Sequence, residues 1–206
     1  MFGKLAADAL GLSDIGKIVS PNDYDKVDTD DYVLHEEGEK IYFLIKSKTD
    51  EYCFTNLALI HLDGSSAISK KRLLKRYNYN KLILSDVALE TAGTIDLDVE
   101  IKFRLGEYSF SIDVTKNQLE SLKLLYKSLL KISNLQYMNN LNYENVVRSL
   151  DTTRDAIGRS TSQTPVIESF SNLYEQVLNI RTSATEKYFQ TDFSAAFEKY
   201  LGTQKS

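Results

Sequence analysis

The segment 95–105 alternates strictly between apolar and charged side chains. A period of two puts one set of side chains on a buried face and the other on a wet face, as in an antiparallel strand of a sheet with one covered face. The buried set is Ile95, Leu97, Val99, Ile101, Phe103 and Leu105. The centre of this chain is therefore predicted to be antiparallel β-structure.

Shorter strand patterns flank this segment and give about seven predicted strands. Asp63-Gly64 follows one of them and predicts a tight two-residue hairpin turn, because such turns require positive φ at their centre. The predicted strands are residues 41–46, 51–55, 57–62, 67–77, 82–90, 95–105 and 108–114.

At Thr115 the apolar period changes from two to 3.6 residues, which predicts a helix over 115–132. Thr115 and Gln118 fit a capping box at its start. The apolar stripe of this helix is expected to pack against the sheets and close one end of a bent barrel. Its members are Leu119, Leu122, Leu125, Tyr126, Leu129 and Ile132.

Helical spacing continues beyond residue 134, and a short helix is also predicted at residues 2–12. Apolar residues repeat at helical spacing up to Gly158, and Thr164-Pro165 starts another helix. Two helices joined by a short loop form a hairpin. The second helix carries a heptad-like seam that a lone hairpin cannot bury, so we expect a partner there. The seam residues are Val166, Phe170, Leu173, Val177 and Ile180.

Composition narrows the function classes. The formal net charge of -4 argues against a dedicated nucleic-acid binder. No apolar run approaches the roughly 20 residues that span a bilayer, and a single cysteine agrees with a reducing, cytoplasmic compartment. The sequence has no phosphate-binding loop, nucleophile elbow or Cys/His zinc set, so we predict no catalytic residue, cofactor or metal.

Three isolated features are interpreted as structural. Cys53 has no neighbouring histidine to lower its thiol pKa and is expected to be buried and inert. His61 lies in an apolar strand and is interpreted as a packing residue. The acidic row Asp96, Asp98 and Glu100 is continued on the same face by two basic residues, Lys102 and Arg104, which favours cross-strand ion pairing or plain solvation over metal or acid chemistry.

The chain resembles the bacterial PH-domain family, in particular members with a YvbH-like C-terminal helical hairpin. The resemblance rests on the segments Asp50-Glu51-Tyr52-Cys53-Phe54-Thr55-Asn56, Leu59-Ile60, Asp63-Gly64, Glu90-Thr91-Ala92-Gly93 and Asp96-Leu97-Asp98. It implies a PH-like split barrel with a capping helix, and assembly into a ring-like homo-oligomer. It implies no catalytic residues.

Eukaryotic PH domains that bind phosphoinositides place basic residues at the end of the first strand and along the second. Here Lys46 and Lys48 flank that turn, but the next strand opens with Asp50 and Glu51. Carboxylates beside a phosphorylated head group would oppose its binding. This departure argues against a phosphoinositide site.

Two segments of opposite charge remain as candidate interfaces. A basic strand within residues 70–81 and an acidic arm within residues 28–39 could meet between neighbouring copies or within one chain. The basic strand could also be a solvated edge, or could bind an anionic membrane surface. The candidate residues are Lys70, Lys71, Arg72, Lys75 and Arg76, and opposite them Asp30, Asp31, Glu36 and Glu37.

The sequence thus predicts an α+β protein: a PH-like split β-barrel of about seven antiparallel strands, capped by a helix and followed by an α-helical hairpin. Residues 1–32 would form an N-terminal helix and arm, 33–134 the PH-like domain, and 135–206 the oligomerising hairpin. The predicted function is a non-enzymatic, self-assembling binding module whose partners are its own copies and a further protein or peptide. A peripheral membrane adaptor acting through residues 70–81 is the alternative.

Overall fold

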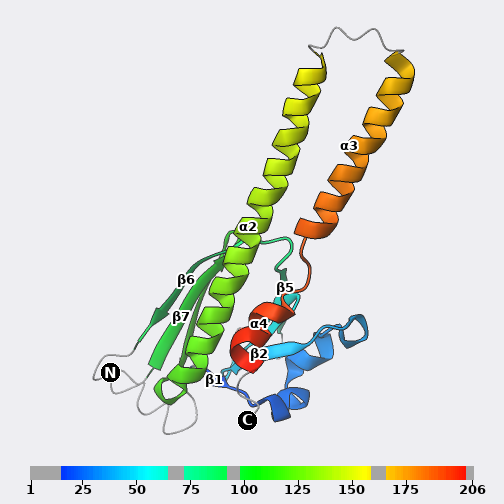
Figure 1. The fold of residues 1–206 in the computed structure, drawn as a ribbon. Coiled ribbons are helices and arrows are strands. Elements are labelled where there is room, and N and C mark those ends of the chain that lie inside the picture. Colours follow the sequence, from blue (N-terminus) through cyan, green and yellow to red (C-terminus); the bar gives the residue numbers. More distant parts are fainter. Residues whose placement is uncertain (1–14, 65–71, 92–97, 159–165, 203–206) are drawn as a thin grey trace. The chain divides into compact units, whose positions relative to one another are not determined.

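The computed structural model describes residues 15–64, 72–91, 98–158 and 166–202. The chain divides into two compact units. Unit 1 comprises Met1–Ser133 together with Thr191–Ser206, and unit 2 comprises Asn134–Gln190. Both are drawn in Figure 1. The predicted helix at residues 2–12 lies outside the described residues.

Unit 1 contains two antiparallel sheets. The first has the order β1-β2-β3-β4-β5 and the second β6-β7-β8. The strands of the first sheet are β1 (Lys17–Ile18), β2 (Ile41–Lys46), β3 (Asp50–Thr55), β4 (Ala58–Asp63) and β5 (Leu73–Asn78). Those of the second are β6 (Leu84–Glu90), β7 (Asp98–Leu105) and β8 (Tyr108–Thr115). The predicted antiparallel PH-like architecture is confirmed, as two sheets rather than a closed barrel.

Gly16 joins the two sheets at one corner. Its N–H donates to the carbonyl of Asp113 at 2.8 Å, and its own carbonyl accepts from the N–H of Thr115 at 3.1 Å. A Cβ at this position would lie 2.6 Å from a methyl carbon of Ile45. Only glycine lets the chain pass this closely between the sheets.

The first sheet is buried on both faces, which explains why its central residues are apolar without alternation. On the inner face, Phe54 lies 5.9 Å from the ring of Phe103 in the second sheet. On the outer face, Leu44, Cys53 and Ile60 form a cluster with Val33 of the acidic arm and with Val27, which directly precedes the arm. The arm contains the 3-10 turns η2 (Asp28–Tyr32) and η3 (His35–Glu37), and the 3-10 turn η1 (Pro21–Lys26) precedes it.

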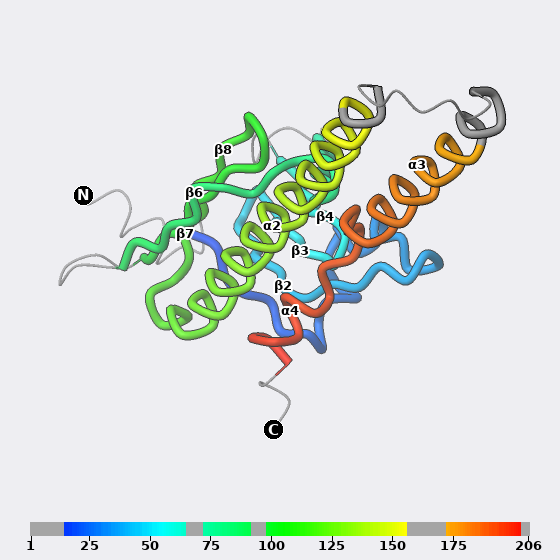
Figure 2. Tube along the Cα trace, turned by 45° about the horizontal axis from the view of Figure 1, so that its top comes forward, coloured from blue at the N-terminus to red at the C-terminus, as the bar shows by residue number. Residues whose placement is uncertain are grey.

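Helix α2 (Leu119–Gly158) starts after the 3-10 turn η4 (Lys116–Gln118), and its first part, up to Ser133, lies beside the strands of unit 1 in Figures 1 and 2. The predicted stripe on its first part is buried, with Leu122, Leu125, Leu129 and Ile132 each 0% exposed. The capping box differs from the prediction. The amide side chain of Gln118 bridges to β1 instead, accepting from the N–H of Ile18 at 2.7 Å and donating to its carbonyl at 3.2 Å.

The chain returns to unit 1 through α4 (Ser194–Leu201), which lies beside β2 in both views. Phe197 stacks on Tyr42 with ring centroids 5.2 Å apart, and Phe193 meets the ring of Tyr79 edge-on at 5.8 Å. Both phenylalanines are buried. Residues from Thr191 onward therefore belong with the two sheets of unit 1, although the sequence analysis grouped them with the hairpin.

The predicted tight turn at Asp63-Gly64 is wrong, because Asp63 pairs with Leu73 and the connection runs through residues 64–72. Gly64 serves a different purpose. A Cβ there would lie 2.4 Å from the carbonyl oxygen of Thr49, so the glycine permits a close approach between two loops. Residues 65–71, including Lys70 and Lys71, lie outside the described part of the chain.

Candidate functional site

The acidic arm and the basic strand β5 meet within one chain. Arg72 forms an ion pair with Asp28, and Arg76 forms a two-pronged pair with Glu39 at 3.0 and 2.9 Å. Lys75 lies 3.8 Å from Asp63 of the adjacent strand. Arg72, Lys75 and Arg76 are thus paired within the chain, which is the within-chain alternative of the sequence interpretation.

The carboxylate of Glu39 organises the end of the arm. Its side chain is fully buried and also accepts from the Leu34 N–H at 2.8 Å and from the hydroxyl of Thr55. Together with Arg76, these donors satisfy a charge that would otherwise be costly to bury. Glu39 therefore fastens the arm to the outer face of the sheet.

The predicted acidic interface residues have different surroundings. Asp30 contacts the ring of His35 at 3.0 Å, within the arm itself. Asp31, Glu36 and Glu37 are exposed. Their role as an interface between copies stays a prediction.

At the β2–β3 hairpin, where a phosphoinositide head group would bind, Lys46 is already paired. Its ammonium lies 2.5 Å from the carboxylate of Glu51, which is itself buried and accepts from the N–H of Thr29 at 2.9 Å. An anionic ligand would have to compete with this carboxylate for Lys46. The geometry therefore argues against a phosphate-binding site at this hairpin.

His61 is a packing histidine with a partner. Its Nε2 lies 2.9 Å from Asp50, and its ring stacks on Tyr52 at 4.3 Å. Burial raises the pKa of Tyr52 to about 12, with Asp50 and other carboxylates adding to the effect. Because a phenol with this pKa stays protonated near neutral pH, Tyr52 is neutral here.

Cys53 lies in the outer cluster of the first sheet and is completely buried. Burial, with the nearby Glu39 carboxylate as the next contribution, raises the pKa of its thiol far above the usual value. A thiol in this environment is a weak nucleophile. Among the residues described, no three His, Cys, Asp or Glu side chains are grouped so that they could hold a metal ion.

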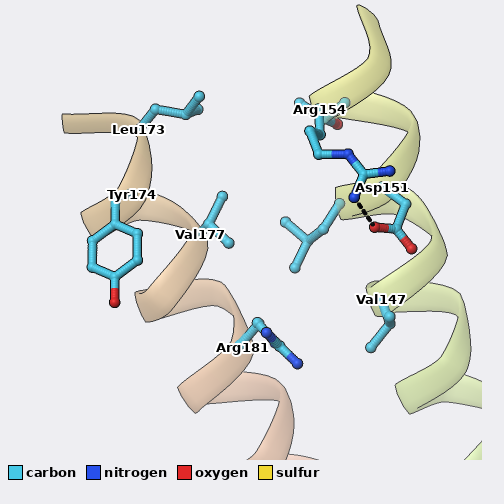
Figure 3. A pocket seen from close by; sticks show the side chains of 9 residues that line it. Val147, Asp151, Arg154, Leu173, Tyr174, Val177 and Arg181 are labelled. Atoms are coloured by element: carbon cyan, nitrogen blue, oxygen red, sulfur yellow. Dashed lines mark ion pairs between the residues drawn. The ribbon is translucent and has the colours of Figure 1, made fainter. Parts of the chain in front are cut away.

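In unit 2, α3 (Val166–Tyr188) and the second part of α2 enclose an apolar groove of about 340 Å³. Figure 3 shows Val147 facing it from α2, and Leu173 and Val177 facing it from α3. Asp151 and Arg154 form an ion pair of 3.3 Å at its edge. The hairpin therefore leaves its own apolar seam incompletely filled.

The residues of the predicted oligomerisation seam differ in their exposure to solvent. Leu173 and Val177 are half-buried along the groove, whereas Ile180 is 47% exposed. The side chains of Val166 and Phe170 lie outside the described set. None of the described helices is both long and apolar enough to cross a membrane.

These two units define a class of protein. It combines a PH-like pair of sheets and a capping helix with a helical hairpin that has an apolar groove and is inserted before the last helix. The family model for the bacterial PH domain matches residues 9–133. The chain therefore belongs to the bacterial PH-domain family.

Two relatives match over nearly the whole chain. The "uncharacterized protein YvbH" of Bacillus subtilis (strain 168) is 55% identical over 202 residues, covering 98% of this chain and 99% of the relative. A PH-domain-containing bacterial protein from Exiguobacterium sibiricum 255-15, known from a crystal structure, is 49% identical with a TM-score of 0.83. That alignment covers 91% of this chain and 100% of the relative, so the similarity includes the hairpin as well as the sheets.

Proposed function

We propose that the protein is a non-enzymatic binding and scaffold module that assembles into ring-like homo-oligomers in the cytoplasm through its hairpin. The PH-like fold supports the role of a binding module, because such a domain offers surfaces to which partners can bind. The sequence analysis also predicted no catalytic residues. The observation that supports assembly is the unfilled apolar groove of unit 2. An exposed apolar patch on the surface of a protein commonly marks a site of contact with another protein.

Further exposed side chains on unit 2 support the same proposal. Tyr137 is 65% exposed and Tyr174 is 59% exposed, and each lies on a helix with other exposed apolar residues. Large aromatic residues are enriched at protein interfaces. Assembly would bury them and would multiply the surface of the PH-like unit.

The alternative, a peripheral membrane adaptor acting through residues 70–81, stays a prediction. Arg72 and Arg76 lie in ion pairs with Asp28 and Glu39. An anionic surface would have to displace these carboxylates, so the structure favours the assembly proposal.

Light scattering of the full chain tests the proposal, with a mass of several subunits expected. Val177→Glu together with Leu150→Glu would put charges into the groove and should lower that mass. The matched control is Tyr32→Ser with Leu34→Ser, which removes two exposed apolar residues from the arm instead. A full chain that runs as a single subunit at micromolar concentration would refute assembly.

A further inference from the structure

The surface under α4 is built from three separate segments of unit 1. Tyr42 comes from β2, Asn56 from the turn between β3 and β4, and Tyr79 from the turn after β5. Phe197 of α4 stacks on Tyr42 and also approaches the ring of Tyr79, with 6.4 Å between the centroids. We call Tyr42, Asn56 and Tyr79 the α4 docking surface; Figures 1 and 2 show α4 beside β2.

Helix α4 meets this surface with a single apolar face. Phe193, Ala196 and Phe197 are buried, whereas Ala195 and Lys199 are exposed. The buried residues stand at positions i, i+3 and i+4, which lie on one face of a helix. An apolar helix face with this spacing is also what proteins recognise when they bind a helical segment of another protein.

Polar contacts at both ends of this face fix the position and direction of α4. The N–H of Phe193 donates to the carbonyl of Asn56 at 2.9 Å, and the amide side chain of Asn56 donates to the carboxylate of Asp192 at 2.8 Å. The hydroxyl of Tyr42 donates to the carboxylate of Glu198 at 2.9 Å. The surface therefore recognises an acidic residue directly before the first aromatic residue, in addition to the two rings.

The docking surface is held in place by contacts that do not involve α4. Asn56 is buried, and two hydrogen bonds with the backbone of Lys40, at 2.7 and 3.2 Å, fix its side chain and its N–H. The N–H of Tyr79 donates to the carbonyl of Leu57 at 3.0 Å. Tyr42 lies where the register of β2 against β3 shifts, and such a bulge redirects a side chain. We therefore expect the surface to persist when α4 leaves it.

Helix α4 is suited to leaving the surface. It has eight residues, and helices this short are marginal in water unless they pack against another part of the protein. The five residues 189–193, which form neither helix nor strand, join it to α3. The contact of α4 with unit 1 can therefore open locally while the sheets stay folded.

We propose that the α4 docking surface binds a helical segment of another protein, and that α4 occupies this site as a displaceable ligand within the chain. The segment carries what the surface contacts in α4: an acidic residue, an aromatic residue directly after it, and a small and an aromatic residue three and four positions further on. This inference rests on the proposed role as a binding module and gives that module a binding surface. Because α4 must leave first, it lowers the apparent affinity for the partner.

Binding of a fluorescently labelled peptide, residues 189–202, tests the proposal. The full chain with Phe193→Ser and Phe197→Ser serves as the opened chain, because its own α4 lacks both aromatic anchors. Fluorescence anisotropy should show saturable binding to the opened chain, and at least about tenfold weaker binding to the wild-type chain, whose site is occupied. A peptide with the same two substitutions should not bind. In the opened chain, Tyr42→Ser should abolish binding, whereas Tyr32→Ser, which removes an exposed tyrosine of the arm, should not change it.

Hydrogen exchange of the wild-type chain gives a second test that needs no substitution. The amides of α4 should exchange at least about tenfold faster than those of β4, because α4 opens while the sheets stay folded. Exchange of α4 only together with β4 would overturn the proposal.

The peptide experiment overturns the proposal in three further cases. The opened chain, shown to be folded by circular dichroism, does not bind the peptide; the wild-type and opened chains bind it equally; or the opened chain binds only an intact second copy, which would make the surface a contact between copies. The mass of the wild-type chain, which tests assembly, is measured without the peptide, so the two proposals can fail separately.

Discussion

Glu39 is the residue whose place in the fold could not be predicted from sequence. In the sequence it is one of several carboxylates in an acidic arm and looks the same as Glu36 and Glu37. In the structure it is buried and bound by Arg76, while the other two are exposed. The difference arises from the register that places Arg76 opposite Ile60 on the outer face of the sheet. Composition indicated that the charges could meet, but only this register selects the partner.

Arg76→Ala should strongly destabilise the protein. The substitution leaves the buried carboxylate of Glu39 without its cation, and breaking a buried ion pair from one side costs about 3–5 kcal/mol. Denaturant unfolding measures the change in the free energy of unfolding. The control is Arg104→Ala, whose exposed partner Asp86 lies 3.8 Å away and whose loss should cost at most about 1 kcal/mol. Equal losses for the two variants would show that Glu39 does not depend on Arg76.

For some helices and strands the local sequence pattern predicts both the element and its buried face, and for others it does not. The strand β7 and the first part of α2 follow their apolar periods, and both were predicted from them. The helix α4 has an ordinary helical pattern of apolar residues, Phe193, Ala196 and Phe197. This pattern does not indicate which part of the chain the helix packs against. Its partners, Tyr42 and Tyr79, are far away in the sequence, so the packing of α4 on unit 1 is a tertiary property.

Leu122→Ala tests the predicted role of α2 as the cap of unit 1. Leu122 is completely buried, and truncating such a leucine costs about 2–5 kcal/mol through lost burial and the cavity left behind. Lys127→Ala on the exposed side of the same helix should change the free energy of unfolding by no more than about 0.5 kcal/mol. A loss below half a kilocalorie for Leu122→Ala, measured in denaturant, would mean that α2 does not close the core.

Phe197→Ala tests the unexpected docking of α4. The ring is fully buried and stacks on Tyr42, so its removal should cost about 3–5 kcal/mol. Lys199→Ala, on the exposed side of α4, is the control and should be nearly neutral. If both variants unfold at the wild-type denaturant concentration, α4 does not contribute to the stability of unit 1.

For the whole molecule, the hairpin has both of its chain ends in unit 1. Residues up to Ser133 and from Thr191 belong to that unit, and unit 2 lies between them in the sequence. The sequence indicated the hairpin from a change in composition near residue 134. It did not reveal the return, because the segment that returns is short.

The substitution Arg72→Glu tests whether the ion pairs between the acidic arm and the basic strand form within one chain or between copies. The pair with Asp28 is exposed, so its reversal should lower the free energy of unfolding only slightly, by about 1 kcal/mol or less. Within-chain pairing predicts an unchanged subunit number by light scattering at low salt. A smaller assembly that Asp31→Lys partly restores would instead support a charged interface between neighbouring copies.

The position of α4 sets an order of events during translation. Phe193 and Phe197, which pack against Tyr79 in unit 1, follow the entire hairpin in the chain. A ribosome therefore exposes all of unit 2 before the PH-like unit can be completed. Nascent chains on one messenger would present their hairpins to each other while their PH-like units still lack the last helix.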